Sequence, residues 1–597
     1  MSKEALRVAN CSGFFGDRLS AAREMVHGGP IDVLTGDWLA ELTMGVLLKQ
    51  RRRDPEAGYA RTFIAQLDDV LEDCLDRDIK IVSNAGGLNP QACARAVEEI
   101  AEQLGREVRV ACVSGDDVTE LFRRERADGW RADHLDTGAA LDAAFEGREL
   151  DVEVANAYLG GWGIAEALSA GADVVVTGRV SDASVIVGPA AWHFGWAPDD
   201  WDALAGAVAA GHVIECGAQA TGGNFSFFTE LGDVRRCGFP IAEISADGSA
   251  TITKHPGTGG AVTTETVTAQ LLYEIGGPRY ANPDVVVRLD TLTLAQEGRD
   301  RVRMSGTRGE PAPSTVKVGA LCPAGWRNAM TFVLTGLDIE EKAAVAQDAL
   351  WEGVPGGRSA FEAVGIRLIR ADSHDPGWTT DAVSLLTVSV TTPDRGLAAR
   401  FSRAATETTL ASYPGLFLAD PPGPGRDYAV FWPTLLPAER VEQRVSLGHD
   451  TWTAGRPPLE EPRDTATGEP PNAIPADARD DETRLVPLGT VLGARSGDKA
   501  GNATLGVWAR DDATFEWLAG WWGESELRAL LPEAADCDMN VWWLPNLRAA
   551  GCTILGFLGH GVAANLDLDS QAKGLGEYLR AKHVEVPSVL LRGASRG

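Results

Sequence analysis

The sequence predicts an α/β protein in two parts: a large N-terminal portion with a mostly parallel sheet and flanking helices, and a small α+β unit at the C-terminus. Short strands alternate with helical segments over the first 180 residues, which is the rhythm of βαβ units. These strands are continuously apolar, as expected where both faces of a parallel sheet are covered. A proline-rich, acidic stretch begins near residue 454, and one core rarely supports 597 residues.

Six strands are predicted in the N-terminal portion, with helices between them. In Pro90–Leu104, apolar residues recur at helical spacing and proline suits the first turn. Tyr59–Asp76 is predicted as another helix. The six strands are Leu6–Cys11, Ile31–Thr35, Ile79–Ser83, Val108–Val113, Val152–Ala157 and Asp173–Thr177.

Residues 1–453 are predicted to form the α/β portion, with an internal boundary considered near residue 185. Beyond it, β-branched residues predict strands at Asp284–Leu294 and Ser384–Thr392. Residues 454–484 hold many prolines and acidic residues, which predicts a linker. Residues 485–597 regain globular composition and have the length of one small domain.

The composition limits the classes of partner. Asp plus Glu number 85 and Lys plus Arg 55, a net charge of −30, so we expect no nucleic-acid partner. A local basic pocket still permits an anionic metabolite. No apolar run reaches the roughly 18 residues that span a bilayer, and no signal peptide is visible, so we expect no membrane partner. Nine scattered cysteines without C-x-x-C spacing favour a reduced, cytoplasmic location.

The predicted strands end in similar ways, and every exit carries Gly, Asn, Asp, Ser or Arg. In an open parallel sheet the ligand crevice lies beyond the carboxyl ends of the strands, so these residues are expected to meet there. Ordinary turn chemistry favours Gly, Asn, Asp and Ser too, and explains part of the pattern. It does not explain an arginine in "VVVTGRVSDAS", where Arg179 and Asp182 follow the strand. They form an internal ion pair or an anchor for a carboxylate or phosphate, and Asp182 can also orient Arg179 for that role.

Two glycine loops are further candidates for binding. In "SGFFGDR", Ser12, Gly13 and Gly16 could offer backbone N–H groups to an anion, although Asp17 could simply cap a helix. In "SNAGGLNP", Asn84 stands directly at the strand end, and Gly86 and Gly87 permit close backbone approach. Neither loop is a Walker or dinucleotide motif.

Candidates for proton transfer are fewer. Glu215, in the glycine-rich "ECGAQATGGNFS" with Asn224, could act as a general acid or base, and so could Asp116. Alternatively, the glycines only allow tight packing. The histidines, His212 among them, are interpreted as isolated packing or surface residues. A metal site from Asp37, Asp116, Asp117 and Asp182 is the weaker interpretation, so no metal ligand is assigned.

The C-terminal unit contains one sharp motif, "ARSGDKAGNATLG". As a plain hairpin, it would expose Asp498 and Lys499 at a solvated tip. As a site, Lys499 would offer a charge to an anion, with Asp498 and Asn502 placing it.

These motifs resemble a known family. "SGFFGDR", "VSNAGGLNP", "VVVTGRVSDASVIVGP" and "ECGAQATGGNF" are similar to the acyclic terpene utilisation (AtuA) family, over roughly residues 5–450. "ARSGDKAGNATLGVWAR" and "GFLGHGVAANLDLDSQAKGLGEYLR" resemble the smaller domain fused behind it, over residues 485–582. The resemblance implies a ferredoxin-like fold for that domain and a role in breaking down citronellol- or geraniol-type compounds through branched acyl-CoA thioesters. It supplies no established catalytic residue. Ala500 stands where the family pattern has glycine.

The sequence suggests two alternative functions. The first is a lyase or hydratase acting on a branched acyl-CoA or carboxylate, in which Arg179 holds the anion and Glu215 or Asp116 moves the proton. Asn84, with the amides of Gly86 and Gly87, would stabilise an enolate-like oxyanion. The second is a non-catalytic partner or scaffold subunit of an acyl-CoA carboxylase, which predicts large exposed apolar patches. A homo-oligomer is expected under both. No cofactor is predicted, and a CoA thioester is a candidate substrate. The sequence does not exclude a bound divalent metal.

Overall fold

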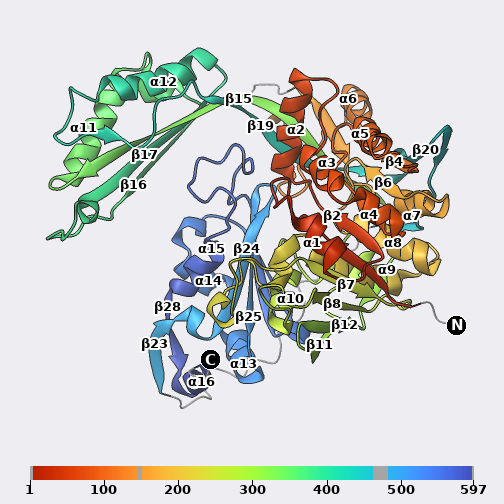
Figure 1. Cartoon of the computed structure of the whole chain (residues 1–597). Helices are drawn as coiled ribbons and strands as arrows, with labels where there is room; N and C mark the ends of the chain where they lie inside the picture. Colours follow the sequence, from red (N-terminus) through yellow and green to blue (C-terminus); the bar gives the residue numbers. More distant parts are fainter. Residues whose placement is uncertain (1–3, 144–150, 462–481, 595–597) are drawn as a thin grey trace.

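The computed structural model describes residues 4–143, 151–461 and 482–594. It shows a main body, an arm that projects from it, and a C-terminal region packed against the body (Figure 1).

The main body is built on one eleven-stranded sheet, and five of its neighbouring strands are parallel. Their valine-rich interiors are fully buried, as continuous apolar runs require. All six predicted strands are confirmed within a few residues, and five of them lie side by side in this sheet. In spatial order they are β1 (Leu6–Asn10), β2 (Val33–Gly36), β3 (Lys80–Ser83), β6 (Val174–Thr177) and β4 (Val110–Ser114).

The prediction of a mostly parallel sheet is wrong, because antiparallel strands extend it at both sides. The added strands all come from beyond residue 185, so the sheet runs without a break across that position. The strand predicted at Val152–Ala157 also leaves this sheet: β5 (Val154–Ala157) pairs with β15 instead. The additions are β7 (Pro240–Ile244), β8 (Ala250–Lys254), β12 (Arg301–Ser305) and β11 (Thr293–Gly298) beside β1, and β20 (Arg444–Leu447) and β21 (Asp450–Thr453) beside β4.

Helices cover both faces of the parallel strands, and successive residues of each strand point into different cores. Leu34 and Val176 pack with one layer, whereas Val33 and Val175 pack with the other. The first layer holds α1 (Ala21–Gly28), α3 (Arg61–Asp68), α4 (Leu71–Asp76) and α5 (Pro90–Gln103), and the second α7 (Trp162–Ser169), α8 (Ser184–Phe194) and α9 (Trp201–Ile214). Further elements are α2 (Glu41–Arg53), α6 (Thr119–Ala127), α10 (Thr264–Leu271), β9 (Arg279–Ala281), β10 (Val286–Arg288), β13 (Arg308–Glu310), β14 (Ala312–Pro313) and β22 (Leu459–Glu460).

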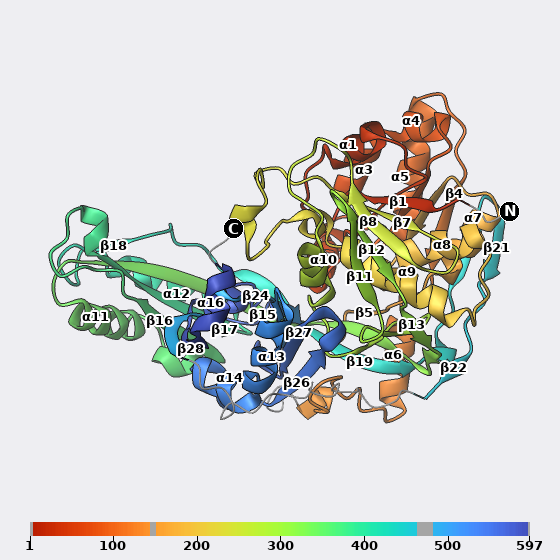
Figure 2. The same ribbon diagram turned by 90° about the horizontal axis from the view of Figure 1, so that it is seen from below.

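The arm, residues 326–426, has two layers, one of strands and one of helices. The long strands β15 (Thr315–Thr335) and β19 (Arg426–Pro437) connect it to the body (Figures 1 and 2). The first half of β15 pairs with β5 and β19, and its second half pairs with β17 (Val383–Thr392). The arm sheet is completed by β16 (Ala363–Ile369) and β18 (Phe417–Leu418). One face of this sheet packs on α11 (Ile339–Glu352) and α12 (Arg395–Glu407).

The C-terminal region contains a four-stranded antiparallel sheet with its own hydrophobic core. Its strand order is β24 (Leu492–Lys499), β25 (Asn502–Ala509), β27 (Ala549–Ile554) and β26 (Met539–Leu544). Beside it lie α13 (Asp512–Trp521), α14 (Glu524–Leu530), α15 (Leu575–Ala581), α16 (Ser588–Ala594) and the pair β23 (Thr483–Pro487) and β28 (His583–Pro587). Its assignment as ferredoxin-like stays a prediction. Most of the predicted linker, residues 462–481, lies outside the described residues.

Every helix that the structure describes is too short or too polar to cross a lipid bilayer.

Candidate functional site

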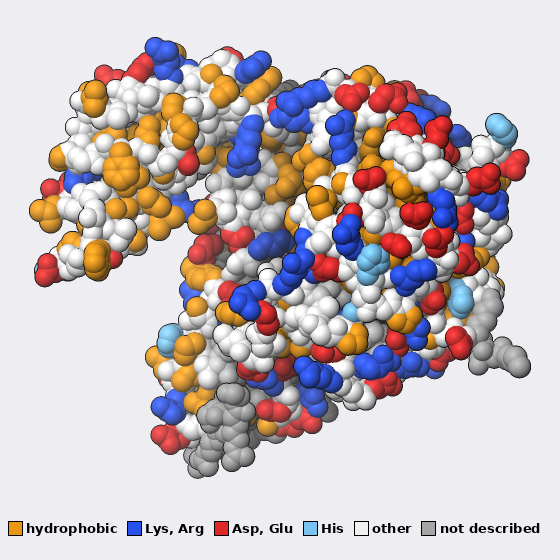
Figure 3. All heavy atoms as spheres, viewed as in Figure 1, with side chains coloured by type: hydrophobic (Ala, Val, Ile, Leu, Met, Phe, Trp, Pro, Cys, Tyr) orange, Lys and Arg blue, Asp and Glu red, His pale blue; other side chains and the backbone are white. Residues whose placement is uncertain are grey.

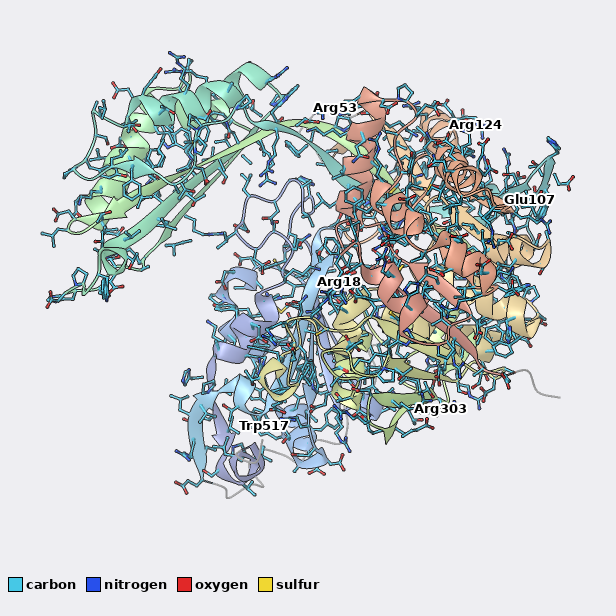
Figure 4. The ribbon with its side chains drawn as sticks, viewed as in Figure 1. Arg18, Arg53, Glu107, Arg124, Arg303 and Trp517 are labelled. Carbon is cyan, nitrogen blue, oxygen red and sulfur yellow. The ribbon has the colours of Figure 1, made fainter. Side chains whose placement is uncertain are left out.

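The exits of the parallel strands meet at one edge of the main sheet. After β2, the Oδ1 atom of Asp37 accepts hydrogen bonds from the side chain of Asn84 at 2.6 Å and from the Leu39 N–H at 2.8 Å. The Asp37 N–H donates to the Ser12 carbonyl at 2.8 Å, which ties the loop after β1 to the same place. Arg18, labelled in Figure 4, follows this loop and donates to the Cys237 carbonyl at 2.8 Å, which ties the loop to the segment before β7.

Asp116 forms the floor beneath the exit of β6. Its Oδ2 atom accepts from the Arg179 backbone N–H and from the Asn156 side chain, both at 2.8 Å. Burial raises the pKa of Asp116 to about 6, although these two donors oppose the shift. With both donors held by its carboxylate, Asp116 secures the turn that presents Arg179.

Arg179 is the most constrained cation of this edge. Its side chain is 4% exposed, its guanidinium lies 4.1 Å above the Tyr158 ring, and Nη1 lies 2.8 Å from Oδ1 of Asp182. That contact lacks hydrogen-bond alignment: neither Nε nor Nη1 has a hydrogen-bond partner among the described residues. Burial opposes the charge, but Asp182, Tyr158 and Asp37 raise the pKa of Arg179 above its ordinary value. Arg179 is thus a permanent cation with donors to spare.

Glu215 lies at the C-terminal end of α9 with His212 one turn before it. Oε1 of Glu215 and Nδ1 of His212 are 3.1 Å apart, and both residues are buried. Oε2 of Glu215 and Nε2 of His212 have no partner within the described ranges. Burial raises the pKa of Glu215, and His212 only partly offsets it. The interpretation of His212 as an isolated packing or surface residue is therefore wrong, because α9 places it one turn from Glu215.

Lys499 enters this edge from the C-terminal region. It ends β24 in a two-residue hairpin whose Ala500 has a φ of 54°, the backbone region that favours glycine. The hairpin tip is half-buried rather than fully solvated, and the charge of Lys499 acts on Glu215, Glu274 and Tyr280. Burial disfavours the ammonium, yet Tyr280 and Glu274 raise its pKa above the ordinary value. In the part of the chain that the structure describes, the Lys499 side chain forms no hydrogen bond or ion pair, whereas its backbone pairs with Asn502 in the hairpin.

The neighbouring Asp498 is held by a lysine from another segment. Nζ of Lys573 lies 3.2 Å from Oδ1 of Asp498 and 3.5 Å from Oε1 of Glu274, and it also contacts the Tyr273 hydroxyl. Burial and Glu274 raise the pKa of Asp498 to about 6. This network fixes the hairpin that presents Lys499.

A third cation completes the edge. Lys317 of β15 lies 4.8 Å from the centre of the Tyr158 ring and pairs with Glu41 of α2 at 3.2 Å. Both Arg179 and Lys317 therefore make cation–π contacts with the Tyr158 ring.

Other predicted residues have structural surroundings. A Cβ on Gly13 would lie 2.4 Å from the Cys216 backbone, and one on Gly86 would lie 2.4 Å from the Thr177 carbonyl, so both glycines permit tight packing. The Gly87 N–H already donates to the Asn84 carbonyl at 3.2 Å. A Cβ on Gly16 would meet the Phe14 ring, Asn224 is exposed at a φ of 57°, and Asn502 accepts from the Gly556 N–H at 3.0 Å. The structure thus brings Arg179, Asp182, Glu215 and Lys499 together, and sets Asn224 and Asn502 apart.

Within residues 4–143, 151–461 and 482–594, no group of three or more His, Cys, Asp or Glu side chains is arranged to hold a metal ion.

A model of a known family matches residues 6–447, most of the chain, and its description is acyclic terpene utilisation family protein AtuA. The chain belongs to the AtuA family. The match includes Arg179, Asp182 and Glu215 and ends before Lys499, so the AtuA-type portion shares its candidate site with a segment beyond the matched residues. No curated protein and no solved structure matches this AtuA-family chain.

Sequence reasoning missed several members of the site. For His212 a signal existed, since "GHVIE" puts it three positions before Glu215 on one helix face. Tyr158 directly follows a predicted strand. Lys317, Glu274, Tyr280 and Lys573 come from segments with no distinguishing local pattern, and only the fold brings them here.

The β6 exit gives a first prediction, in which one chemical change has opposite effects at two glycines. A Cβ on Gly178 would lie 2.2 Å from Oδ1 of Asp116, whereas Gly45, inside α2, has no neighbouring atom within 4 Å. We expect Gly178→Ala to destabilise the fold by about 3 kcal/mol, because a buried carboxylate must move. Gly45→Ala should stabilise it by about 0.5–1 kcal/mol through helix propensity. Urea unfolding of both variants checks this, and equal effects would contradict the described β6 turn.

The raised pKa of Asp116 gives a second prediction. The folded protein binds this proton more tightly than the unfolded chain does, so the free energy of unfolding falls as pH rises from about 4 to about 6. Asp116→Asn removes this loss and keeps a carbonyl acceptor. The free energy of unfolding of Asp116→Asn minus that of wild type should therefore become more positive by up to about 3 kcal/mol as the pH rises from 4 to 7. Urea unfolding across that range measures the difference, and a constant difference would refute the assignment.

Proposed function

We propose that this AtuA-family protein is a lyase or hydro-lyase that acts on a branched carboxylate or its CoA thioester. The observation that carries the proposal is Arg179: its guanidinium is buried, Nη1 is ion-paired with Asp182, and Nε has no hydrogen-bond partner among the described residues, so it is suited to hold a carboxylate or phosphate oxygen. Asp182 orients this cation, and Tyr158 supports its flat face.

Glu215 is the proposed proton carrier. In the first step its carboxylate takes the proton from the carbon next to the carbonyl group, and the C–H electron pair moves onto the carbonyl oxygen. In the second step the carbonyl re-forms, the bond to a β-hydroxyl group breaks, and Glu215 returns the proton so that water leaves. The raised pKa of Glu215 suits a group that must both accept and release a proton near neutral pH.

Lys499 is the proposed partner of the enolate oxygen. It is a half-buried ammonium whose side chain has no hydrogen-bond partner among the described residues, and the charges of Tyr280 and Glu274 hold it at this edge. Asn84 is less suited to this role than the sequence predicted, because Asp37 and the Trp38 N–H already engage its side chain. We also propose that residues 485–597 act as a separate, ferredoxin-like domain that supplies Lys499.

A ligand screen followed by a turnover assay tests this function. Acyl-CoAs, free branched acids and divalent metals are added singly, and thermal unfolding is recorded. A ligand at about 100 times its dissociation constant stabilises the fold by about 2.7 kcal/mol. We expect branched acids or acyl-CoAs to do so, and to exchange their α-proton in heavy water. If none of them binds or exchanges, the proposal is wrong.

A scaffold role is the second candidate, and the arm favours it. The arm exposes Leu410, Leu337 and Trp378 at 99%, 81% and 78%. Capture of an acyl-CoA carboxylase subunit without any α-proton exchange would support this candidate over the enzyme.

A further inference from the structure

The arm sheet ends in an open edge at β16. Among the described strands, β17 alone pairs with β16, and no residue of β16 is buried, whereas most of β17 is. For residues 363–369, no hydrogen bond from another described segment reaches the outer backbone groups. Proteins usually protect such edges with prolines, bulges or several charges, and β16 carries only Arg367.

The contacts on the two faces of β16 leave the outer backbone groups of this strand uncovered. On one face Val364, Ile366 and Leu368 pack toward α11 and α12. On the other, Arg367 pairs with Asp567, and Leu566 of the same loop lies beside Gly365. Figure 3 shows a notch between the arm and the C-terminal region, with hydrophobic side chains on the arm beside it.

We propose that the β16 edges of two copies of this chain pair antiparallel around a two-fold axis at Ile366, which joins both arms into one sheet. An axis at the central residue allows all seven residues to pair. Ile366 then faces Ile366 of the second copy, Val364 faces Leu368, and Ala363 faces Ile369. Arg367 faces Gly365, so no like charges stand opposite each other.

Exposed apolar side chains near the β16 edge also favour a second copy of this chain as its partner. Trp378 follows β16 at the distal end of the arm, and Leu568, 79% exposed, adjoins the loop that contacts Arg367. Antiparallel pairing turns the distal end of one arm toward this loop of the other copy. These side chains extend the contact toward the 1,200–2,000 Å² that stable interfaces typically bury, which strand pairing alone does not reach.

The arm is also suited to contact between acidic copies. It holds nine Lys or Arg and twelve Asp or Glu, a net charge of −3, while the whole chain carries −30. Repulsion between the bodies remains, so association should strengthen with added salt.

The test measures the mass of the full chain by light scattering during gel filtration, at about 50 µM in 0.15 and 0.5 M NaCl. We expect a dimer. Ile366→Lys places two lysines opposite each other across the axis and should yield a folded monomer. Its thermal unfolding midpoint should fall below that of wild type, because the variant loses both the dimer contact and the packing of Ile366 toward α11 and α12. A wild-type monomer, or a dimer that survives Ile366→Lys, overturns the proposal.

A second variant covers the case in which Ile366→Lys disturbs the arm. Ile366→Cys should form a disulfide between copies under mild oxidation, because the axis sets this residue against itself. Leu368→Cys is the matched control and should not cross-link, since it faces Val364. Wild type under the same oxidation accounts for the native cysteines. Equal cross-linking at both positions, or none at position 366, contradicts the pairing.

Discussion

Arg179→Met is expected to abolish ligand binding and to lower the free energy of unfolding by about 3–5 kcal/mol. The side chain is 4% exposed, so the change removes the buried guanidinium that pairs with Asp182 and whose charge favours the buried Asp37 carboxylate. The methionine fills a similar volume, which limits the cavity contribution. Urea unfolding gives the stability change, and the thermal shift with a binding acid gives the loss of affinity.

Arg23→Met is the control for the loss of an arginine as such. Arg23 pairs with Asp69, but its side chain is 55% exposed, and surface pairs contribute only about 0–1 kcal/mol. We expect a small stability change and full ligand binding. If Arg179→Met also binds the ligand as wild type does, Arg179 is a structural cation and the proposed anchor is wrong.

Glu215→Gln is expected to reduce proton transfer by a factor of about 10²–10⁴ while the fold stays as stable as wild type at pH 7.5. Gln removes the base but can still contact Nδ1 of His212. Stability should not fall, because burial raises the pKa of Glu215 and thus disfavours its charged form in the fold. The readouts are α-proton exchange in heavy water and thermal unfolding.

Glu340→Gln, on the arm and far along the chain from the site, is the matched control and should exchange protons at the wild-type rate. Retained exchange in Glu215→Gln would move the base to another residue. Lost binding together with lost exchange would instead make Glu215 part of the ligand pocket rather than the proton carrier.

Much of the sheet could be predicted from the sequence, because burial on both faces leaves a local record. Runs such as "VVVT" at residues 174–177 predict buried parallel strands. The proline at position 90 likewise predicted the start of α5, and in the structure the Asn89 side chain caps it by accepting from the Ala92 N–H at 3.2 Å. The antiparallel additions were missed because strands from residues 240–305 and 444–453 join the sheet through long-range pairing, which no local pattern specifies.

By themselves, the sequence motifs pointed to the family. The sequence also determined the positions of most core strands and the residues at their exits, because apolar runs and turn chemistry act between near neighbours. The tertiary structure alone decided which exits form a site. It decided that Asp116 lies beneath Arg179, that His212 meets Glu215 in a buried pair, and that Lys499 reaches the sheet edge from another region. It also decided that β16 stays open, since an edge exists only where no other strand pairs. Distance and burial set these electrostatic and pairing partners, and both arise only when remote segments pack together.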